Sequence, residues 1–206
     1  MSSRSAALHP PPDPAEDARI GILGGSFNPA HDGHRHISEQ AIRLLDLDQV
    51  WWLVSPQNPL KSPEGMATID DRYRSCRDLL GEHDRIVPTD LEIDLGTRKT
   101  AETLPKILDL YPGRRFVWLM GADNLIQIGR WADWTTIFET LPVAVFARPT
   151  YSAKALRSKA AQRYSSARIE ARDAAGLATM AAPAWVYLDI EEHPASATAI
   201  RAREQS

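Results

Sequence analysis

The stretch Ile20-Gly-Ile-Leu-Gly-Gly-Ser-Phe-Asn-Pro-Ala-His-Asp-Gly-His-Arg-His-Ile-Ser38 decides the fold of this chain. It opens with a short apolar run that ends at the pair Gly24-Gly25, which predicts a buried strand followed by a turn. Beyond Gly33 the apolar residues recur at helical spacing, at Ile37, Ala41, Leu44 and Leu45. The stretch therefore predicts a strand, a glycine turn and a helix in direct succession.

The glycine turn and the start of this helix form a candidate anion site. Two residues without a Cβ let the main chain approach a ligand, and the helix start adds unpaired N–H groups and a positive dipole end. His31 lies just before the helix and His34 in its first turn, so both rings can grip the oxygens of one polyphosphate. The alternatives are an ordinary turn with two solvated histidines, or zinc, for which two His without a third ligand fall short of the usual coordination.

Composition favours one soluble domain. The chain has 206 residues, of which 43% are hydrophobic and 25% charged, with a net charge of −3. This balance provides no general attraction to nucleic acid or to an anionic membrane, so neither is expected as a partner. A lone cysteine, Cys76, excludes an internal disulfide and is expected in the core. The chain lacks a signal-like or membrane-length apolar run, and we expect a cytoplasmic protein.

Alternating strand and helix patterns predict the fold class. The proline-rich residues 1–18 are expected to form a disordered tail, and residues 19–206 a single domain. Residues 91–95 are interpreted as a half-exposed strand or loop, and residues 152–180 as one or two amphipathic helices. Without hairpin signals, the pattern predicts an α/β, Rossmann-like, doubly wound parallel sheet. Apolar runs predict its further strands at residues 50–54, 85–88, 116–120, 143–146 and 185–188.

Further candidate binding residues follow the predicted strands, where open α/β sheets bind ligands. Asn58 and Lys61 follow the second strand, and Lys61 is either a phosphate ligand or a solvated lysine. Asp123 can accept hydrogen bonds from ribose hydroxyls or cap a helix. Trp131 is the candidate for stacking on a flat ring, whereas Trp134 is assigned to the core. The arginines of the helix after Thr68 (Arg72, Arg74 and Arg77) are expected to be solvated.

Two motifs at opposite ends of the chain resemble one superfamily. Gly24-Gly-Ser-Phe-Asn-Pro-Ala-His-Asp-Gly-His34 is similar to the His-x-Gly-His signature of nucleotidylyltransferases, and its form resembles the bacterial nicotinate-nucleotide adenylyltransferase family. Pro194-Ala-Ser-Ala-Thr-Ala-Ile-Arg201 resembles the superfamily's Ile-Ser-Ser-Thr-x-Ile-Arg signature, with alanines at 195 and 197. A family Tyr-Thr-x-Asp-Thr-Leu pattern is matched at Thr100 but has Lys99 in place of its tyrosine.

The resemblance implies residue roles, which we carry over position by position. It implies catalytic roles for His31, His34, Lys61 and Arg201. It implies ATP binding by Gly24, Gly25, Ser26, Phe27, His31, His34, Asp123, Ser196, Thr198, Ile200 and Arg201. It implies binding of the nicotinate nucleotide by Asn58, Thr100 and Trp131, and no metal-ligating residues.

The resemblance also implies an activity. AMP would be transferred from ATP to nicotinate mononucleotide, giving nicotinate adenine dinucleotide and pyrophosphate in NAD biosynthesis, with Mg²⁺ carried by ATP. A sister enzyme acting on nicotinamide mononucleotide or phosphopantetheine, a non-catalytic adenine-nucleotide binder and an RNA-linked role are the alternatives. The last is disfavoured because the chain lacks a basic appended domain. A homo-oligomer is left open.

Overall fold

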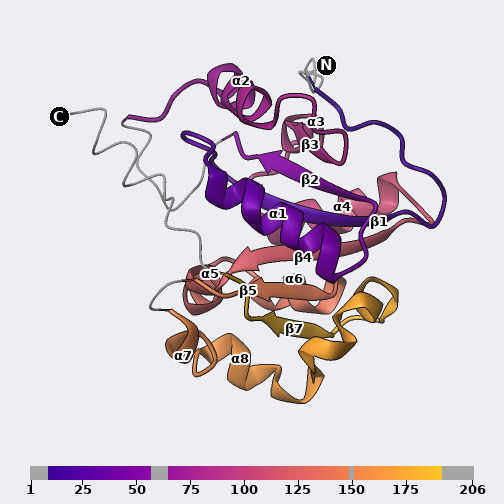
Figure 1. The fold of residues 1–206 in the computed structure, drawn as a ribbon, viewed down its shortest axis with the longest axis vertical. Helices are drawn as coiled ribbons and strands as arrows, with labels where there is room; N and C mark the ends of the chain where they lie inside the picture. The colour runs from indigo at the N-terminus through magenta and orange to yellow at the C-terminus, as the bar shows by residue number, and fades with distance from the viewer. Residues whose placement is uncertain (1–8, 57–64, 149–150, 192–206) are drawn as a thin grey trace.

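A computed structural model describes residues 9–56, 65–148 and 151–191. Within these residues one parallel sheet of seven strands has the order β3-β2-β1-β4-β5-β7-β6 (Figure 1). The strands are β1 (Arg19–Gly25), β2 (Gln49–Val54), β3 (Ile86–Thr89), β4 (Arg115–Gly121), β5 (Val143–Phe146), β6 (Arg168–Ile169) and β7 (Trp185–Leu188). From β1, the strands β2 and β3 extend the sheet to one side, and β4 begins its extension to the other side. The carboxyl end of β1 is therefore the switch point, where open α/β sheets bind their ligands.

Helices cover both faces of the sheet, and the predicted doubly wound fold is confirmed. Figure 1 shows α1 lying across one face in front of β1 and β2. The α-helices are α1 (Asp32–Leu44), α2 (Ile69–Leu80), α3 (Leu91–Asp94), α4 (Thr100–Leu110), α5 (Ala122–Gln127), α6 (Trp134–Thr140), α7 (Ser152–Ala155) and α8 (Lys159–Arg163). Short 3₁₀ helices are η1 (Ile128–Arg130), η2 (Ser165–Ala167) and η3 (Ala171–Thr179).

Each face of the sheet has its own hydrophobic core because successive strand residues point to opposite sides. Trp51 and Trp118 flank Ile22 in register and belong to the core shared with α4 and α6. Trp52 points the other way, into the core shared with α1, α2 and η3. Cys76 is fully buried in this second core, as predicted. Strands buried on both faces explain the continuous apolar runs of the sequence.

Two segments differ from the sequence predictions. Residues Leu91–Asp94 form the short helix α3 rather than a strand, because Glu92 turns inward and accepts a hydrogen bond from Thr103. The segment 152–180 is divided into α7, α8, η2, β6 and η3 instead of one or two amphipathic helices. Ser158 interrupts the helical pattern by capping α8 with its side chain, a role that serine favours over a mid-helix position.

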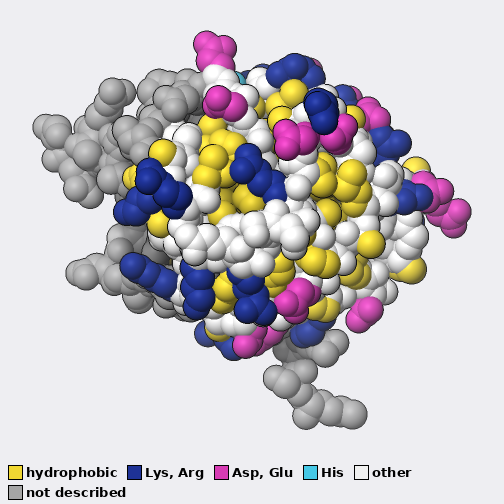
Figure 2. Space-filling view, turned by 90° about the horizontal axis from the view of Figure 1, so that it is seen from below, with side chains coloured by type: hydrophobic (Ala, Val, Ile, Leu, Met, Phe, Trp, Pro, Cys, Tyr) yellow, Lys and Arg dark blue, Asp and Glu magenta, His cyan; other side chains and the backbone are white. Residues whose placement is uncertain are grey.

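The basic residues of this segment are exposed, as the sequence indicated. Figure 2 views the molecule from below and shows several Lys and Arg side chains on that face. Lys159 and Arg163 lie over the ring of Trp134, 6.0 and 5.9 Å from its centroid. Trp134 itself is buried in the core, as predicted. The charges therefore cover an aromatic core residue while they remain in water.

Residues 9–18 pack against the domain, although the sequence predicted a disordered tail over residues 1–18. The side chains of Pro11 and Pro14 are buried, and the amide of His9 donates to Asp90 Oδ1 over 3.0 Å. The ring of His9 stacks on Tyr73, with the centroids 3.6 Å apart. Prolines lose little backbone freedom on ordering, which lowers the entropic cost of docking this segment.

Candidate active site

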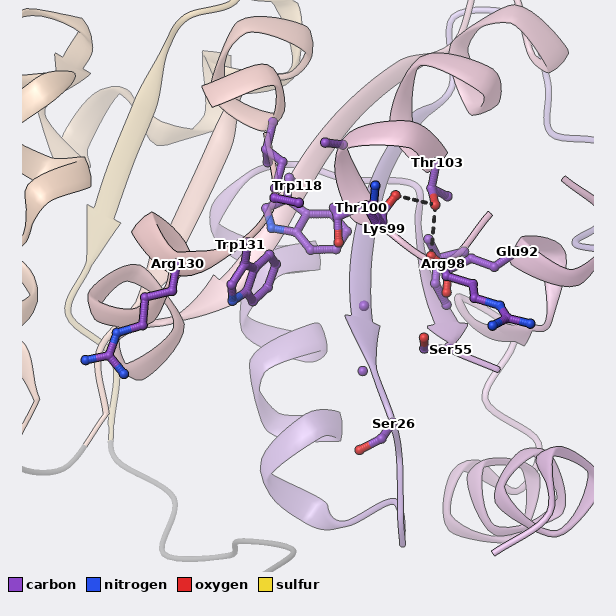
Figure 3. Close-up of a pocket in the computed structure, with 16 residues that line it drawn as sticks. Ser26, Ser55, Glu92, Arg98, Lys99, Thr100, Thr103, Trp118, Arg130 and Trp131 are labelled. Atoms are coloured by element: carbon purple, nitrogen blue, oxygen red, sulfur yellow. Dashed lines mark hydrogen bonds between the residues drawn. The ribbon is translucent and has the colours of Figure 1, made fainter. Parts of the chain in front are cut away.

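A cavity of about 270 Å³ opens at the carboxyl end of β1. It lies at the switch point of the sheet, since its floor comes from β1, β2 and β4 (Figure 3). The opposite wall comes from the start of α4 and from the segment between η1 and α6. The lining residues are Gly24, Gly25, Ser26, Leu53, Ser55, Glu92, Arg98, Lys99, Thr100, Ala101, Thr103, Trp118, Arg130, Trp131, Ala132 and Ile137.

The cavity brings together five of the predicted site residues. Gly24, Gly25 and Ser26 contribute the glycine turn, and Thr100 and Trp131 face it from α4 and from the residue after η1. Ser26 and Thr100 are more than 70 positions apart in the sequence. They meet because β1 lies between β2 and β4 in the sheet. A glycine turn and a flat aromatic ring therefore share one hollow.

The two predicted histidines lie at the start of α1, next to the glycine turn. His31 is the N-cap residue and is 5% exposed, and its ring stacks on that of His34 with centroids 3.8 Å apart. The backbone N–H of His31 donates to Nδ1 of His34 over 3.3 Å. In the neutral ring this hydrogen bond assigns the proton to Nε2, which leaves Nε2–H as the donor.

A buried chain of hydrogen bonds fixes the first turn of α1 to the sheet. Trp52 Nε1 donates to Ser38 Oγ over 2.8 Å, and Ser38 Oγ donates to the carbonyl of His34 over 2.9 Å. Phe27 packs between Trp52 and His34, with ring centroids 5.0 and 4.7 Å away. Phe27 is only 2% exposed and does not line the cavity, so contact of this predicted residue with a nucleotide stays a prediction.

Asp123 lies in the first turn of α5, just after β4, and its carboxylate faces an arginine. Arg148 Nε is 3.3 Å from Asp123 Oδ1, with 28% and 23% of the two side chains exposed. A Cβ on Gly121 would lie 2.5 Å from Asp123 Oδ1 and 2.6 Å from Arg148 Nε, so only glycine leaves room for this pair. A role of Asp123 in ribose binding stays a prediction.

Several predicted residues lie outside the described part of the chain. They are Asn58, Lys61, Ser196, Thr198, Ile200 and Arg201. At the start of α4, Lys99 is the N-cap residue and Thr100 is the first residue of the helix. Thr68 caps α2, because its hydroxyl accepts a hydrogen bond from the amide of Asp71.

The sequence did not predict a polar network that lines one wall of the cavity and is buried there. Thr103 Oγ1 donates to Glu92 Oε1 over 2.9 Å (Figure 3). It also lies 2.8 Å from Thr97 Oγ1. Burial raises the pKa of Glu92, and hydrogen bonds from Thr103 and Ser55 oppose that rise. The alternating apolar and acidic residues of 91–95 suggested exposure, so nothing in the sequence pointed to a buried carboxyl group here.

The sequence also failed to indicate that Arg72 belongs to the site, because its helical pattern predicts a solvated side chain. It is 2% exposed and donates to the carbonyls of Ser26 and Ser55 over 2.7 Å each. Its neighbour Arg74, by contrast, leaves 72% of its side chain exposed. Of the three arginines of α2, Arg72 is thus buried beneath the glycine turn, whereas Arg74 and Arg77 are exposed.

The parallel sheet with a glycine turn and a cavity at its switch point defines a nucleotide-binding α/β protein. Comparison with known sequences narrows this class. The Cytidylyltransferase-like family matches residues 22–203. A "Probable nicotinate-nucleotide adenylyltransferase" of Parvibaculum lavamentivorans is 50% identical over 185 residues, covering 90% of this chain and 92% of the relative. One from Cereibacter sphaeroides is 50% identical over 183 residues, covering 89% and 96%.

Solved structures share the fold. The Plasmodium falciparum nicotinic acid mononucleotide adenylyltransferase complexed with NaAD aligns with a TM-score of 0.68 at 16% identity, over 90% of this chain and 83% of that chain. The chain therefore belongs to the Cytidylyltransferase-like family and, within it, to the nicotinate-nucleotide adenylyltransferases. Among the described residues, no helix combines the length and apolarity needed to cross a membrane.

Proposed function

We propose that this protein transfers AMP from ATP to nicotinate mononucleotide and releases pyrophosphate. The observation that carries the proposal is the cavity in which the glycine turn of β1 faces Trp131 and the first turn of α4. The relatives' name, and the NaAD in the structure of similar fold, support the same substrates. The product would be nicotinate adenine dinucleotide, a precursor in NAD biosynthesis.

The acceptor's ring fits the apolar part of the cavity. The indole of Trp131 offers a flat face on which a pyridine ring can stack. Lys99, Thr100 and Ala101 bring the N-terminal turn of α4 to the wall, with its N–H groups and positive dipole end. A carboxylate gains more from that end of the helix than a neutral amide does. This favours nicotinate over nicotinamide.

The chemistry requires positioning and charge stabilisation. An oxygen of the acceptor's phosphate attacks the α-phosphorus of ATP, a P–O bond forms, and the bond to the β-phosphate oxygen breaks as pyrophosphate leaves. The acceptor phosphate is already anionic near neutral pH, so no general base is needed. We assign stabilisation of the α-phosphate charge to His34 through Nε2–H, with His31, Lys61 and Arg201 along the triphosphate.

Mg²⁺ is expected to enter with ATP. The described residues contain no cluster of three or more His, Cys, Asp or Glu side chains that could hold a metal ion. An ion bound through nucleotide phosphates and water needs no such cluster. When bound, it would supply positive charge to the departing pyrophosphate.

One experiment tests the proposal directly. The purified protein is incubated with ATP, Mg²⁺ and, in separate reactions, nicotinate mononucleotide, nicotinamide mononucleotide or phosphopantetheine. We expect dinucleotide and pyrophosphate to form fastest with nicotinate mononucleotide, and chelation of Mg²⁺ to stop the reaction. Faster turnover of another acceptor would instead identify a sister enzyme, and ATP binding without turnover of any acceptor would identify a nucleotide binder.

A further inference from the structure

The side chain of Arg72 joins three segments around the glycine turn. From α2, its Nη1 donates to the carbonyls of Ser26 and Ser55 over 2.7 Å each. Nη2 donates to the carbonyl of Pro56 over 3.2 Å, and Nε donates to the carbonyl of Ala67 over 3.1 Å. One rigid guanidinium thus connects the loop after β1, the end of β2 and the residue before the cap of α2.

This buried cation is not neutralised by an acid within the described residues. No ion pair between Arg72 and a carboxylate is formed in that part of the chain, and its acceptors are all backbone carbonyls. The nearby thiol of Cys76 stays neutral, because burial raises its pKa to about 12. The positive charge therefore persists directly behind Ser26, a residue of the cavity wall.

The contact with Ser26 also determines how the next peptide group is oriented. In a planar trans peptide the carbonyl of one residue and the N–H of the next point in opposite directions. Because the carbonyl of Ser26 points at Arg72, the N–H of Phe27 points away from it. Ser55 is held in the same way, and its own N–H donates to the carbonyl of Gly25 over 3.0 Å.

We propose that Arg72 is a positioning residue of the nucleotide site. It orients the Ser26–Phe27 peptide toward bound phosphate. Its charge, which pairs with no carboxylate of the described residues, favours an anionic ligand at the glycine turn. This inference rests on the proposed function, since it takes the phosphates of ATP as the ligand. Arg72 acts through the backbone of the turn and need not touch the nucleotide itself.

The alternative is a purely structural role, in which Arg72 only holds α2 to the sheet. The two roles predict different ATP affinities for the folded protein. A structural arginine changes the temperature of unfolding but not the affinity of the molecules that remain folded. A positioning arginine changes the affinity for ATP at temperatures where wild type and variant are both fully folded.

The experiment compares Arg72→Met, Arg72→Lys and the control Arg74→Met by calorimetric titration with Mg²⁺-ATP in the absence of acceptor. Arg74 lies on the same helix with its side chain 72% exposed, so its loss should leave the ATP Kd within about twofold. Arg72→Met should raise the Kd about tenfold or more, through lost charge-assisted hydrogen bonds. Arg72→Lys keeps the positive charge but loses the planar guanidinium with its several N–H donors, so its Kd should lie between those of Arg72→Met and Arg74→Met.

Thermal unfolding curves establish that each titration is made on folded protein. If Arg72→Met does not fold, Arg72→Lys carries the test, because a lysine in the same place cannot reach four carbonyls at once. The inference is overturned if wild type, Arg72→Met and Arg74→Met bind ATP with equal affinity. If Arg72→Lys is the only Arg72 variant that folds, equal affinity of wild type and Arg72→Lys overturns it. Wild type that binds ATP but forms no dinucleotide overturns the proposed function and leaves the comparison of affinities valid.

Discussion

The indole of Trp118 occupies the space that a side chain on Gly24 would need. A Cβ built on Gly24 would lie 2.5 Å from ring atom Cη2 of Trp118, closer than any real Cβ contact. Both residues line the cavity, and the strands β1 and β4 that carry them are neighbours in the sheet. The glycine therefore shapes the floor of the cavity by letting the edge of a large ring come close to the backbone.

Gly24→Ala should reduce both the use of nicotinate mononucleotide and the stability of the fold. The ring of Trp118 has to move, and a displacement of about 1 Å in a site can cost up to about a hundredfold in rate. We expect kcat/KM for the acceptor to fall by about tenfold to a hundredfold, measured by dinucleotide formation. Overpacking of this kind costs about 1–3 kcal/mol, so the unfolding free energy should fall by that amount.

Gly176→Ala is the matched control for this change. A Cβ at Gly176 would come no closer than 3.7 Å to Met180 Cε, which is ordinary contact, and the residue lies in η3 outside the cavity lining. Its kinetics should equal those of wild type. If Gly24→Ala also keeps wild-type kcat/KM, the floor formed by Trp118 has no part in acceptor binding.

The fold was predictable because its signals are local. The strand, glycine turn and helix of residues 20–38 are each indicated by consecutive residues. Strands buried on both faces give continuous apolar runs, which can be identified without knowing the neighbouring strand. The division of residues 152–180 was not predictable in this way. The two-residue strand β6 exists only because Arg168 and Ile169 pair with β7, and pairing of that kind leaves no periodic pattern.

The candidate site was predictable only where a motif or a strand end marked it. The glycine turn, Thr100 and Trp131 share the cavity because each follows or faces the switch point. Arg72 could not be found, since its spacing on α2 resembles that of the exposed Arg74 and Arg77. What distinguishes Arg72 is a set of carbonyls on other segments, which only the tertiary structure brings near.

Trp131→Ala should weaken binding of the mononucleotide and leave ATP binding unchanged. Loss of one aromatic stacking partner costs about 1–3 kcal/mol for a base, so the KM for nicotinate mononucleotide should rise by about tenfold or more. Trp131→Phe keeps a flat ring and should lose less. Initial rates at varied concentrations of each substrate check this, and an equal rise in both KM values would argue against stacking on the acceptor alone.

His34→Ala should lower kcat and leave the fold intact. Its Nε2–H is the donor we assign to the α-phosphate, and loss of one such donor costs about a hundredfold to a thousandfold in kcat. His36→Gln is the control on the same helix, because it keeps a donor for the carbonyl of Glu191, 2.7 Å from His36 Nε2. Single-turnover rates separate chemistry from product release. Near-normal turnover by His34→Ala would remove His34 from the mechanism.

Glu92→Gln should change how stability depends on pH. Burial raises the pKa of Glu92 above the ordinary glutamate value of 4.5, so the folded protein keeps this proton to higher pH than the unfolded chain. The free energy of unfolding therefore loses the contribution of Glu92 as pH rises from 4.5 through the raised pKa. Glutamine keeps an oxygen that can accept from Thr103 but carries no charge to desolvate.

The free energy of unfolding of Glu92→Gln, relative to wild type, should thus increase as pH rises through this window and then level off. Urea unfolding at a series of pH values measures it, and subtracting wild type cancels the other carboxylates. Glu39→Gln is the control, since the Glu39 carboxylate is 42% exposed and pairs with Arg35 at the surface. A difference that stays constant from pH 4.5 to neutral would mean that Glu92 titrates alike in the folded and unfolded chains. Its burial beside the cavity would then carry no electrostatic cost.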